Sequence, residues 1–150
     1  MQSALPNLPA MTHILFLDFD GVLHPTSSSP DGYFCRVDHL KGALAGSACK
    51  LVISSSWRHH HELSALIARF PASLRGRFIG ATGPPCFGRW PRYQEVLAFV
   101  RKVPDCTSWG ALDDSRNEFP VDCPELIACD PNVGLDTPQI EALQLWLGRH

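Results

Sequence analysis

Short runs of consecutive apolar residues alternate along the chain with longer segments in which apolar residues recur every three or four positions. Such runs are typical of strands buried on both faces, and such recurrences are typical of amphipathic helices. Five segments are expected to be strands: 14–17, 50–53, 77–82, 109–112 and 126–129. Since helical segments separate them and no hairpin signal joins two strands, the pattern predicts an α/β fold. We expect a three-layer parallel sheet of about five strands with helices on both faces.

Four segments carry the helical spacing. They begin near Asp38, at Arg58, at Pro91 and at Thr137, and the second is expected to run as one helix over 58–70. Asp38 is a good N-cap residue, and proline suits the first turn of a helix. The chain therefore alternates strands and helices from about residue 13 to its end.

The composition is that of an ordinary soluble domain. The chain has 150 residues, of which 45% are apolar and 19% charged, with a net charge of −2. No block of Lys and Arg indicates binding to duplex nucleic acid or to a membrane surface. Neither a signal peptide nor an apolar run long enough to cross a bilayer is visible, which predicts a cytoplasmic protein. The six cysteines show no C-x-x-C spacing, and most are expected to be reduced.

The first ten residues are expected to be a flexible lead-in. They hold two prolines and few large apolar side chains, and they precede the first strand. The ordering of ten residues costs more free energy than the burial of two leucines returns. We therefore expect a single domain over residues 11–150.

Polar residues that carry chemistry follow three of the predicted strands. Asp18 and Asp20 end the first strand, and a glycine directly after them lets the chain turn. A serine pair at 54–55 ends the second strand, and an aspartate pair at 113–114 ends the fourth. Ligands of parallel α/β sheets bind outside the carboxyl ends of the strands. Carboxylates gathered there are costly unless a cation compensates their charge, so the pattern favours a metal site.

These three motifs, in this order, resemble those of the haloacid dehalogenase-like phosphohydrolase superfamily, abbreviated HAD. Asp18-Phe19-Asp20-Gly21-Val22-Leu23 resembles its first motif, Val52-Ile53-Ser54-Ser55 its second, and Ala111-Leu112-Asp113-Asp114 its acidic fourth. The resemblance covers the chain from about residue 13 to the C-terminus. It implies a Mg²⁺-dependent phosphomonoester hydrolase that works through an aspartyl-phosphate intermediate.

The resemblance also implies a role for each matching residue. Asp18 would be the nucleophile and a metal ligand. Asp20 would be the general acid and base, with its backbone carbonyl at the metal. One of Asp113 and Asp114 would complete the Mg²⁺ shell, and both stay open. A serine at the end of the second strand would donate a hydrogen bond to the phosphate, and this could be Ser54 or Ser55.

The third motif of the superfamily is normally a lysine, and this chain departs from it. No lysine lies between residues 50 and 102, while Arg92 stands in the first turn of the helix where that cation belongs. A guanidinium can neutralise a phosphate with two donors. Lys102 is the alternative, near the far end of the same helix.

Two further residues are candidates for substrate binding. Arg58 follows the second motif, and His24 follows the first. The run His59-His60-His61 looks metal-like, but neighbouring residues on a helix point in different directions, so it is expected to be a solvated turn.

Superfamily members often carry a cap domain, but the gaps between the motifs here leave room only for a loop and one helix, so we expect a minimal cap or none. An open site would accept a bulky phosphosubstrate, such as a phosphoprotein or a nucleic-acid end, as well as a small molecule. The Ser-Ser-Trp-Arg turn resembles that of compact members linked to RNA repair. A catalytically silent binding module of the same fold is the main alternative. A receiver-type signalling domain is disfavoured, because its acidic pair is adjacent and its acceptor aspartate ends the third strand.

Overall fold

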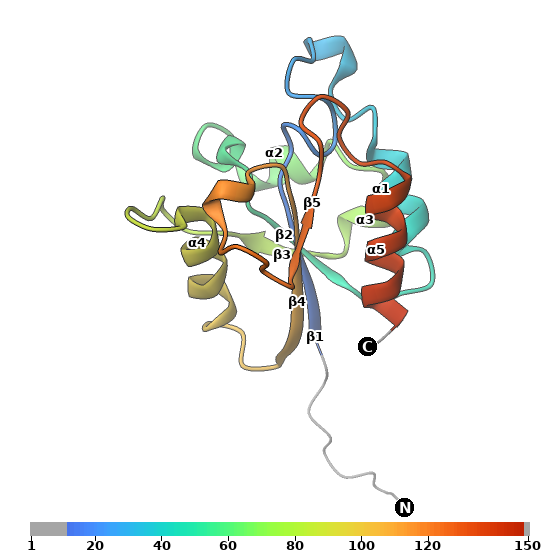
Figure 1. Cartoon of the computed structure of the whole chain (residues 1–150). Helices are drawn as coiled ribbons and strands as arrows, with labels where there is room; N and C mark the ends of the chain where they lie inside the picture. The colour runs from blue at the N-terminus through green and yellow to red at the C-terminus, as the bar shows by residue number, and fades with distance from the viewer. Residues whose placement is uncertain (1–11, 149–150) are drawn as a thin grey trace, which may run out of the picture.

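The computed structural model describes residues 12–148, and its centre is a five-stranded, wholly parallel sheet (Figure 1). The strands lie in the order β3-β2-β1-β4-β5. Their bounds are β1 Thr12–Leu17, β2 Lys50–Ile53, β3 Phe78–Ala81, β4 Cys106–Asp113 and β5 Leu126–Ala128. The predicted α/β fold and the number of strands are confirmed. The expected lead-in, residues 1–10, lies outside the described residues.

Helices cover both faces of the sheet, which makes the predicted three layers. They are α1 Val37–Leu44, α2 Leu63–Ile67, α3 Ala72–Arg75, α4 Pro91–Val100 and α5 Thr137–Gly148, with short 3-10 helices η1 Pro30–Gly32, η2 Ser56–His59 and η3 Arg116–Glu118. In Figure 1 the sheet is seen nearly edge-on, with α4 on one side and α1, α3 and α5 on the other.

The alternation of side chains along β1 explains the two apolar layers. Leu15 and Leu17 point into the larger cluster, which includes residues of α1, α2, α3 and α5. Ile14 and Phe16 point into the smaller cluster with Val96 of α4. All four side chains are fully buried, as expected of a central strand of a parallel sheet.

The helix predicted over 58–70 is wrong. The segment contains the tight turn η2, then α2, and α3 follows after Pro71. The hydroxyl of Ser55 accepts a hydrogen bond from the backbone N–H of Trp57, which caps η2, and Glu62 is extended (ψ 147°) before α2 begins. The apolar spacing was real, since Leu66 and Phe70 are buried, but α2 ends at Ile67 and Phe70 lies in the turn that follows it.

Element ends differ slightly from the prediction elsewhere. Helix α1 begins at Val37 with Arg36 at the N-cap, so Asp38 lies in the first turn instead of capping the helix. Strand β4 begins at Cys106, three residues earlier than expected from its apolar core. All six cysteines lie within the described residues and are unpaired.

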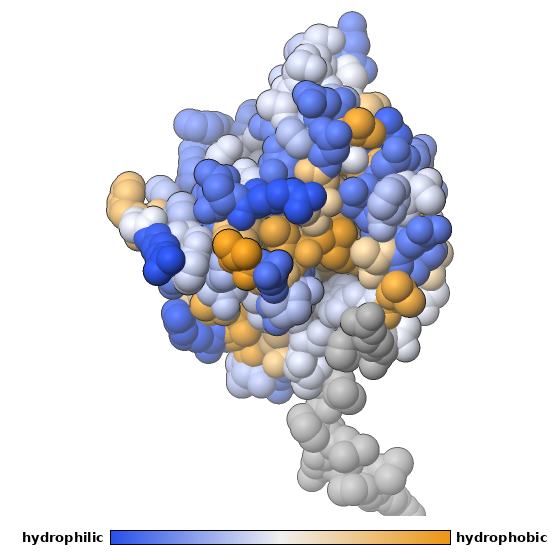
Figure 2. All heavy atoms as spheres, viewed as in Figure 1, coloured by the Kyte–Doolittle hydropathy of each residue, from blue (hydrophilic) through white to orange (hydrophobic). Residues whose placement is uncertain are grey.

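The edge strand β5 faces the viewer in Figures 1 and 2, and hydrophobic residues gather on that face. A hollow of about 460 Å³ lies there, with Leu126, Ile127, Leu145 and Trp146 among its lining residues. It runs along the sheet edge and is distinct from the strand ends where the polar motifs lie. No helix within residues 12–148 is long and apolar enough to cross a membrane.

Candidate active site

The carboxyl ends of the strands are held level by backbone hydrogen bonds. In each case the residue just after a strand donates its N–H to the carbonyl at the end of a neighbouring strand. The pairs are Asp18 to Leu112 (3.1 Å), Ser54 to Leu17 (3.0 Å), Thr82 to Ile53 (2.9 Å) and Cys129 to Asp113 (2.9 Å). The ladder thus continues one residue past each strand and brings the motif residues to one edge of the sheet.

Three carboxyl groups meet at this edge. Oxygens of Asp18, Asp113 and Asp114 all lie within 4.8 Å of one another. Asp18 and Asp113 are buried, with 6% and 1% of their surface exposed, and Asp114 is half-buried. Such a cluster of oxygen ligands suits a hard divalent cation. Both residues of the 113–114 pair therefore stand close enough to Asp18 to share an ion with it.

Burial disfavours the ionised form of two carboxyl groups of the cluster, and Arg92 offsets this effect only in part. Burial, then the charge of Asp113, raises the pKa of Asp18 well above its usual value, although Arg92 acts in the opposite direction. Burial also raises the pKa of Asp113 to about 6, against the effects of Arg92 and the backbone N–H of Ser115. A bound cation would supply the missing positive charge.

Gly21 is required by the position of Asp114. Its φ is +79°, and a Cβ there would lie 2.6 Å from Cγ of Asp114, closer than real atoms approach. The glycine of the first motif therefore does more than turn the chain. It leaves the space in which the Asp114 carboxyl group lies against the backbone.

Arg92 is the cation of the site. It lies in the first turn of α4, and its Nη1 is 3.1 Å from Asp113 Oδ2 and 3.5 Å from Asp18 Oδ1. Burial alone would lower the pKa of Arg92, but Asp113 and Asp18 outweigh it and raise that pKa. Lys102, the alternative, lies beyond the opposite end of α4 and is exposed.

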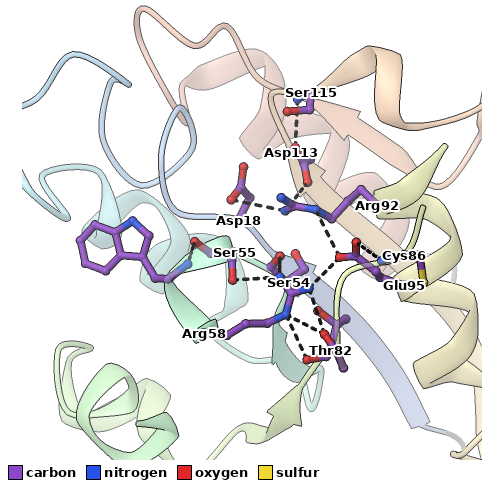
Figure 3. A network of polar contacts seen from close by, with 12 residues as sticks. Asp18, Ser54, Ser55, Arg58, Thr82, Cys86, Arg92, Glu95, Asp113 and Ser115 are labelled. Carbon is purple, nitrogen blue, oxygen red and sulfur yellow. Dashed lines mark hydrogen bonds and ion pairs between the residues drawn. The ribbon is translucent and has the colours of Figure 1, made fainter. Parts of the chain in front are cut away.

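A buried ion pair lies beside these groups, and the sequence analysis did not find its acid partner, Glu95 (Figure 3). Glu95 Oε1 accepts a hydrogen bond of 2.7 Å from Arg58, and it lies 3.8 Å from Nε of Arg92. Its other oxygen accepts the backbone N–H of Cys86 at 3.2 Å. The i, i+3 spacing from Arg92 to Glu95 on one helix was the signal that could have revealed it.

Arg58 is fully engaged within the protein. Besides Glu95, it donates to four backbone carbonyls, those of Ser54, Ser55, Thr82 and Gly83. These acceptors take all five N–H donors of the guanidinium. Arg58 therefore connects the ends of β2 and β3 to α4 through its hydrogen bonds, whereas the sequence suggested that it binds substrate.

Asp20 is held apart from the three-carboxylate cluster by two donors. Its Oδ1 lies 2.8 Å from His24 Nε2, and its Oδ2 accepts a 3.0 Å hydrogen bond from Trp57 Nε1. The backbone N–H of Phe34 donates to His24 Nδ1 at 3.1 Å, so the ring proton is on Nε2 and points to Asp20. His24 is fully buried and contacts Asp20 from within the protein, whereas the sequence suggested that it lines the open site.

The two candidate serines differ in their surroundings, although each is only 1% exposed. Ser55 Oγ accepts the Trp57 N–H at 3.2 Å as the cap of η2. Ser54 directly follows Ile53, which pairs with Leu17, so Ser54 stands level with Asp18 on the same face of the sheet. This register places Ser54 beside the cluster and gives Ser55 a local structural contact.

The sequence matches the family described as HAD domain in Swiss Army Knife RNA repair proteins, over residues 14–140. The chain belongs to this family. No curated protein and no solved structure matched the chain. Membership of a HAD family agrees with the fold and suggests a function of the phosphohydrolase type.

Besides Glu95, two residues of this HAD site were not foreseen as parts of it. The sequence singled out Trp57 only as part of the Ser-Ser-Trp-Arg turn, yet its indole N–H donates a hydrogen bond to Asp20. Thr82 ends β3 and is 5% exposed, and its hydroxyl has no partner within the described residues. An apolar strand that ends in threonine, as the second motif ends in serine, was the signal for Thr82.

Proposed function

We propose that this HAD domain is a Mg²⁺-dependent phosphomonoester hydrolase that acts through an aspartyl-phosphate. The observation that carries the proposal is the cluster of Asp18, Asp113 and Asp114 with Arg92 between two of its members. When all three carboxyl groups are ionised, their negative charge exceeds the single positive charge of Arg92. The family membership supports the same type of reaction.

The metal ligands in this proposal are Asp18, Asp113 and Asp114, together with the backbone carbonyl of Asp20. The raised pKa values of Asp18 and Asp113 support this assignment, because burial disfavours their ionised forms and Arg92 offsets this only in part, so that a cation would stabilise the carboxylates. Mg²⁺, when bound, supplies the positive charge that lets an anionic nucleophile approach an anionic phosphate.

The first chemical step is the attack of an Asp18 carboxylate oxygen on phosphorus. The bond between phosphorus and the ester oxygen breaks, and the leaving oxygen takes a proton from the Asp20 carboxyl group. Arg92 donates to the phosphoryl oxygens as charge builds on them, and Ser54 donates a further hydrogen bond. The product of this step is an aspartyl-phosphate and a free alcohol.

The second step releases phosphate. Asp20, now ionised, accepts a proton from a water molecule whose oxygen attacks the phosphorus. The acyl-phosphate bond breaks, and Asp18 returns as a carboxylate. An N–H donor on each oxygen fixes the orientation of the Asp20 carboxyl group, which supports its roles as general acid in the first step and general base in the second.

The substrate class that we favour is a terminal phosphate on a nucleic acid, in particular an RNA end. The family description names RNA repair proteins, and within residues 12–148 the segments between the motifs are short, which supports an open site without a cap domain. A long substrate can reach such an open site, which a buried pocket would exclude.

The test is phosphate release from p-nitrophenyl phosphate and from phosphorylated oligoribonucleotides, with Mg²⁺ and with excess EDTA. We expect turnover of both substrates with Mg²⁺ and none with EDTA. Turnover that is equal in EDTA would exclude the metal-dependent mechanism.

The alternative is a HAD-fold module that binds Mg²⁺ and a phosphorylated partner without turnover. The contact between Arg92 and Asp18 favours it, because an ion pair weakens a nucleophile. Calorimetry combined with a phosphate assay separates the two functions. The alternative predicts that Mg²⁺ and phosphorylated oligoribonucleotide both bind, and that no phosphate is released over many hours.

A further inference from the structure

A second hollow opens on the Asp20 side of the site. It has a volume of about 300 Å³ and is lined by Asp20, Tyr33, Trp57, His60, His61 and Arg69. None of its lining residues belongs to the three-carboxylate cluster. In the proposed reaction Asp20 protonates the leaving oxygen, so the part of the substrate that leaves lies on this side.

Arg69 is an exposed cation that packs on two aromatic rings and has no acid partner in the part of the chain that the structure describes. Its guanidinium carbon lies 5.2 Å from the ring centroid of Trp57 and 5.6 Å from that of Phe34. Within residues 12–148 it forms no ion pair with a carboxylate. The aromatic rings hold the guanidinium in place by cation–π attraction without neutralising it, so its N–H donors stay available to an anion.

Two imidazoles add further donors at the hollow. The backbone N–H groups of His60 and His61 both donate to the carbonyl of Trp57, at 3.0 and 3.1 Å. This tight turn after η2 brings both exposed side chains to the hollow, and the His61 ring lies 5.6 Å from that of Trp57. The broken helix over 58–70 is therefore what creates the cluster, since a continuous helix would spread these residues around its axis.

The lining has the chemistry of a site for an anion next to an organic group. Asp20 is its one carboxylate, and both oxygens of Asp20 already accept hydrogen bonds. Tyr33 and Trp57 are half-buried and give the hollow an aromatic wall. A second phosphate group, one sugar away from the phosphate that is removed, would meet Arg69 while the sugar and base contact the rings.

We infer that this hollow binds the phosphodiester next to the terminal phosphate of a single-stranded polynucleotide. The inference rests on the proposed function, since the catalytic site sets which side of the substrate reaches the hollow. A small bisphosphate offers the same second anion, but a polynucleotide also offers the neighbouring base and sugar that the aromatic wall would contact. The hollow thus selects substrates by their leaving group.

The test compares kcat/KM for four kinds of substrate in the wild-type protein and in Arg69→Ala. They are p-nitrophenyl phosphate, a nucleoside 5′-monophosphate, a nucleoside 3′,5′-bisphosphate, and single-stranded hexaribonucleotides phosphorylated at either end. We expect at least one hexanucleotide to exceed the monophosphate by about tenfold or more. Arg69→Ala should remove this advantage and lower the rate with p-nitrophenyl phosphate far less, since that substrate has no second anion, and Arg69→Lys should keep part of the advantage.

Arg101→Ala is the matched control. Arg101 is an exposed arginine at the C-terminal end of α4, and the site lies at the other end of that helix. Its loss should change none of the four rates. An equal fall of all four rates in Arg69→Ala, or equal kcat/KM for monophosphate and hexanucleotides, would overturn the inference. An advantage confined to the bisphosphate would assign the hollow to small molecules instead.

A binding measurement keeps the inference separate from catalysis. Fluorescence anisotropy of a labelled, phosphorylated hexaribonucleotide on Asp18→Asn should give a Kd that rises about tenfold when Arg69→Ala is added. This result would support the anion site even if wild-type protein hydrolysed none of the substrates, in which case the proposed function alone would fail. An unchanged Kd would overturn the inference.

Discussion

The indole Nε1 of Trp57 donates a 3.0 Å hydrogen bond to Asp20 Oδ2, across 37 positions of the sequence. With His24 on the other oxygen, both acceptor atoms of Asp20 are held. The second motif thus reaches back to the first through the residue that follows its serines. The orientation of Asp20 therefore depends on the tight turn η2 as much as on β1.

The contact between Trp57 and Asp20 predicts that substitutions of either residue lower kcat in a way that depends on the leaving group of the substrate. Asp20→Asn should lower kcat by about 10²–10⁴-fold for alkyl phosphates, because the leaving oxygen then receives no proton. Trp57→Phe, which keeps an aromatic ring but removes the N–H donor, should give the same pattern with a smaller loss. Both losses should shrink for aryl phosphates, whose leaving groups need little protonation. Equal losses across a leaving-group series would remove the acid role from Asp20.

A methyl group at position 21 is predicted to disrupt the acidic cluster. Gly21→Ala places a Cβ against Asp114 at a φ of +79°, which should cost at least about 1–3 kcal/mol and displace the carboxyl group. Urea unfolding and Mg²⁺ titration measure both effects.

Gly42→Ala is the control for this substitution. Gly42 lies within α1, and nothing lies within 4 Å of a Cβ there, so alanine should stabilise the helix by up to about 1 kcal/mol. If Gly21→Ala matched Gly42→Ala in stability and in Mg²⁺ affinity, the account of the first-motif glycine would be wrong.

The sequence was sufficient to predict the sheet and its polar edge. Fully apolar runs such as 14–17 can only be buried on both faces, and parallel strands bring their carboxyl ends together. Asp18, Asp113 and Arg92 therefore meet as the motifs indicated. The hydrophobic pattern fixes the register of the strands, and the register in turn fixes where Asp18 and Asp113 lie relative to each other.

The contacts around the cluster could not be predicted in the same way. The spacing from Arg92 points to Glu95, but Arg58 and Glu95 are 37 positions apart, and nothing local in either segment indicates that these two residues pair. The helix predicted over 58–70 fails at its start for a similar reason. Arg58 donates hydrogen bonds to the carbonyls of Ser54 and Ser55, and the chain forms a tight turn there instead of a regular helix. Hydrogen bonds made by side chains to the backbone compete with a regular helix and leave little trace in apolar spacing.

The buried acidic cluster predicts a dependence of stability on pH in EDTA. The pKa of Asp113 is raised from 3.8 to about 6, so the folded state holds this proton more tightly than the unfolded chain. The tighter binding of this proton stabilises the folded state fully below about pH 4, and the stabilisation is lost as the pH rises through about 6. The free energy of unfolding should change by about 3 kcal/mol over this range.

The measurement is urea unfolding of wild-type protein and Asp113→Asn between pH 4 and 7, in the presence of EDTA. The difference in unfolding free energy should move in favour of the variant as the pH rises, and saturating Mg²⁺ should restore the wild-type protein at pH 7. Parallel pH profiles would show that Asp113 ionises at no cost in the folded state.

The substituted third motif predicts an asymmetry between two cations on one helix. Arg92→Ala should lower kcat/KM by about a hundredfold or more, since the guanidinium next to Asp18 and Asp113 is lost. Arg92→Lys should retain a sizeable part of the activity as a point charge. Lys102→Ala should behave as wild type. A large loss in Lys102→Ala with little change in Arg92→Ala would reverse the assignment.

The central claim is that Asp18 is the nucleophile of a Mg²⁺-dependent phosphatase. The most direct measurement is the rate of phosphate release from p-nitrophenyl phosphate, with Mg²⁺, by wild-type protein, Asp18→Asn and Asp105→Asn. Asp105 is an exposed carboxylate that precedes β4, at the opposite end of that strand from the acidic cluster. We predict turnover by wild type and Asp105→Asn and no detectable turnover by Asp18→Asn, with all three proteins folded by circular dichroism. Retention of most of the wild-type rate by Asp18→Asn would contradict the account.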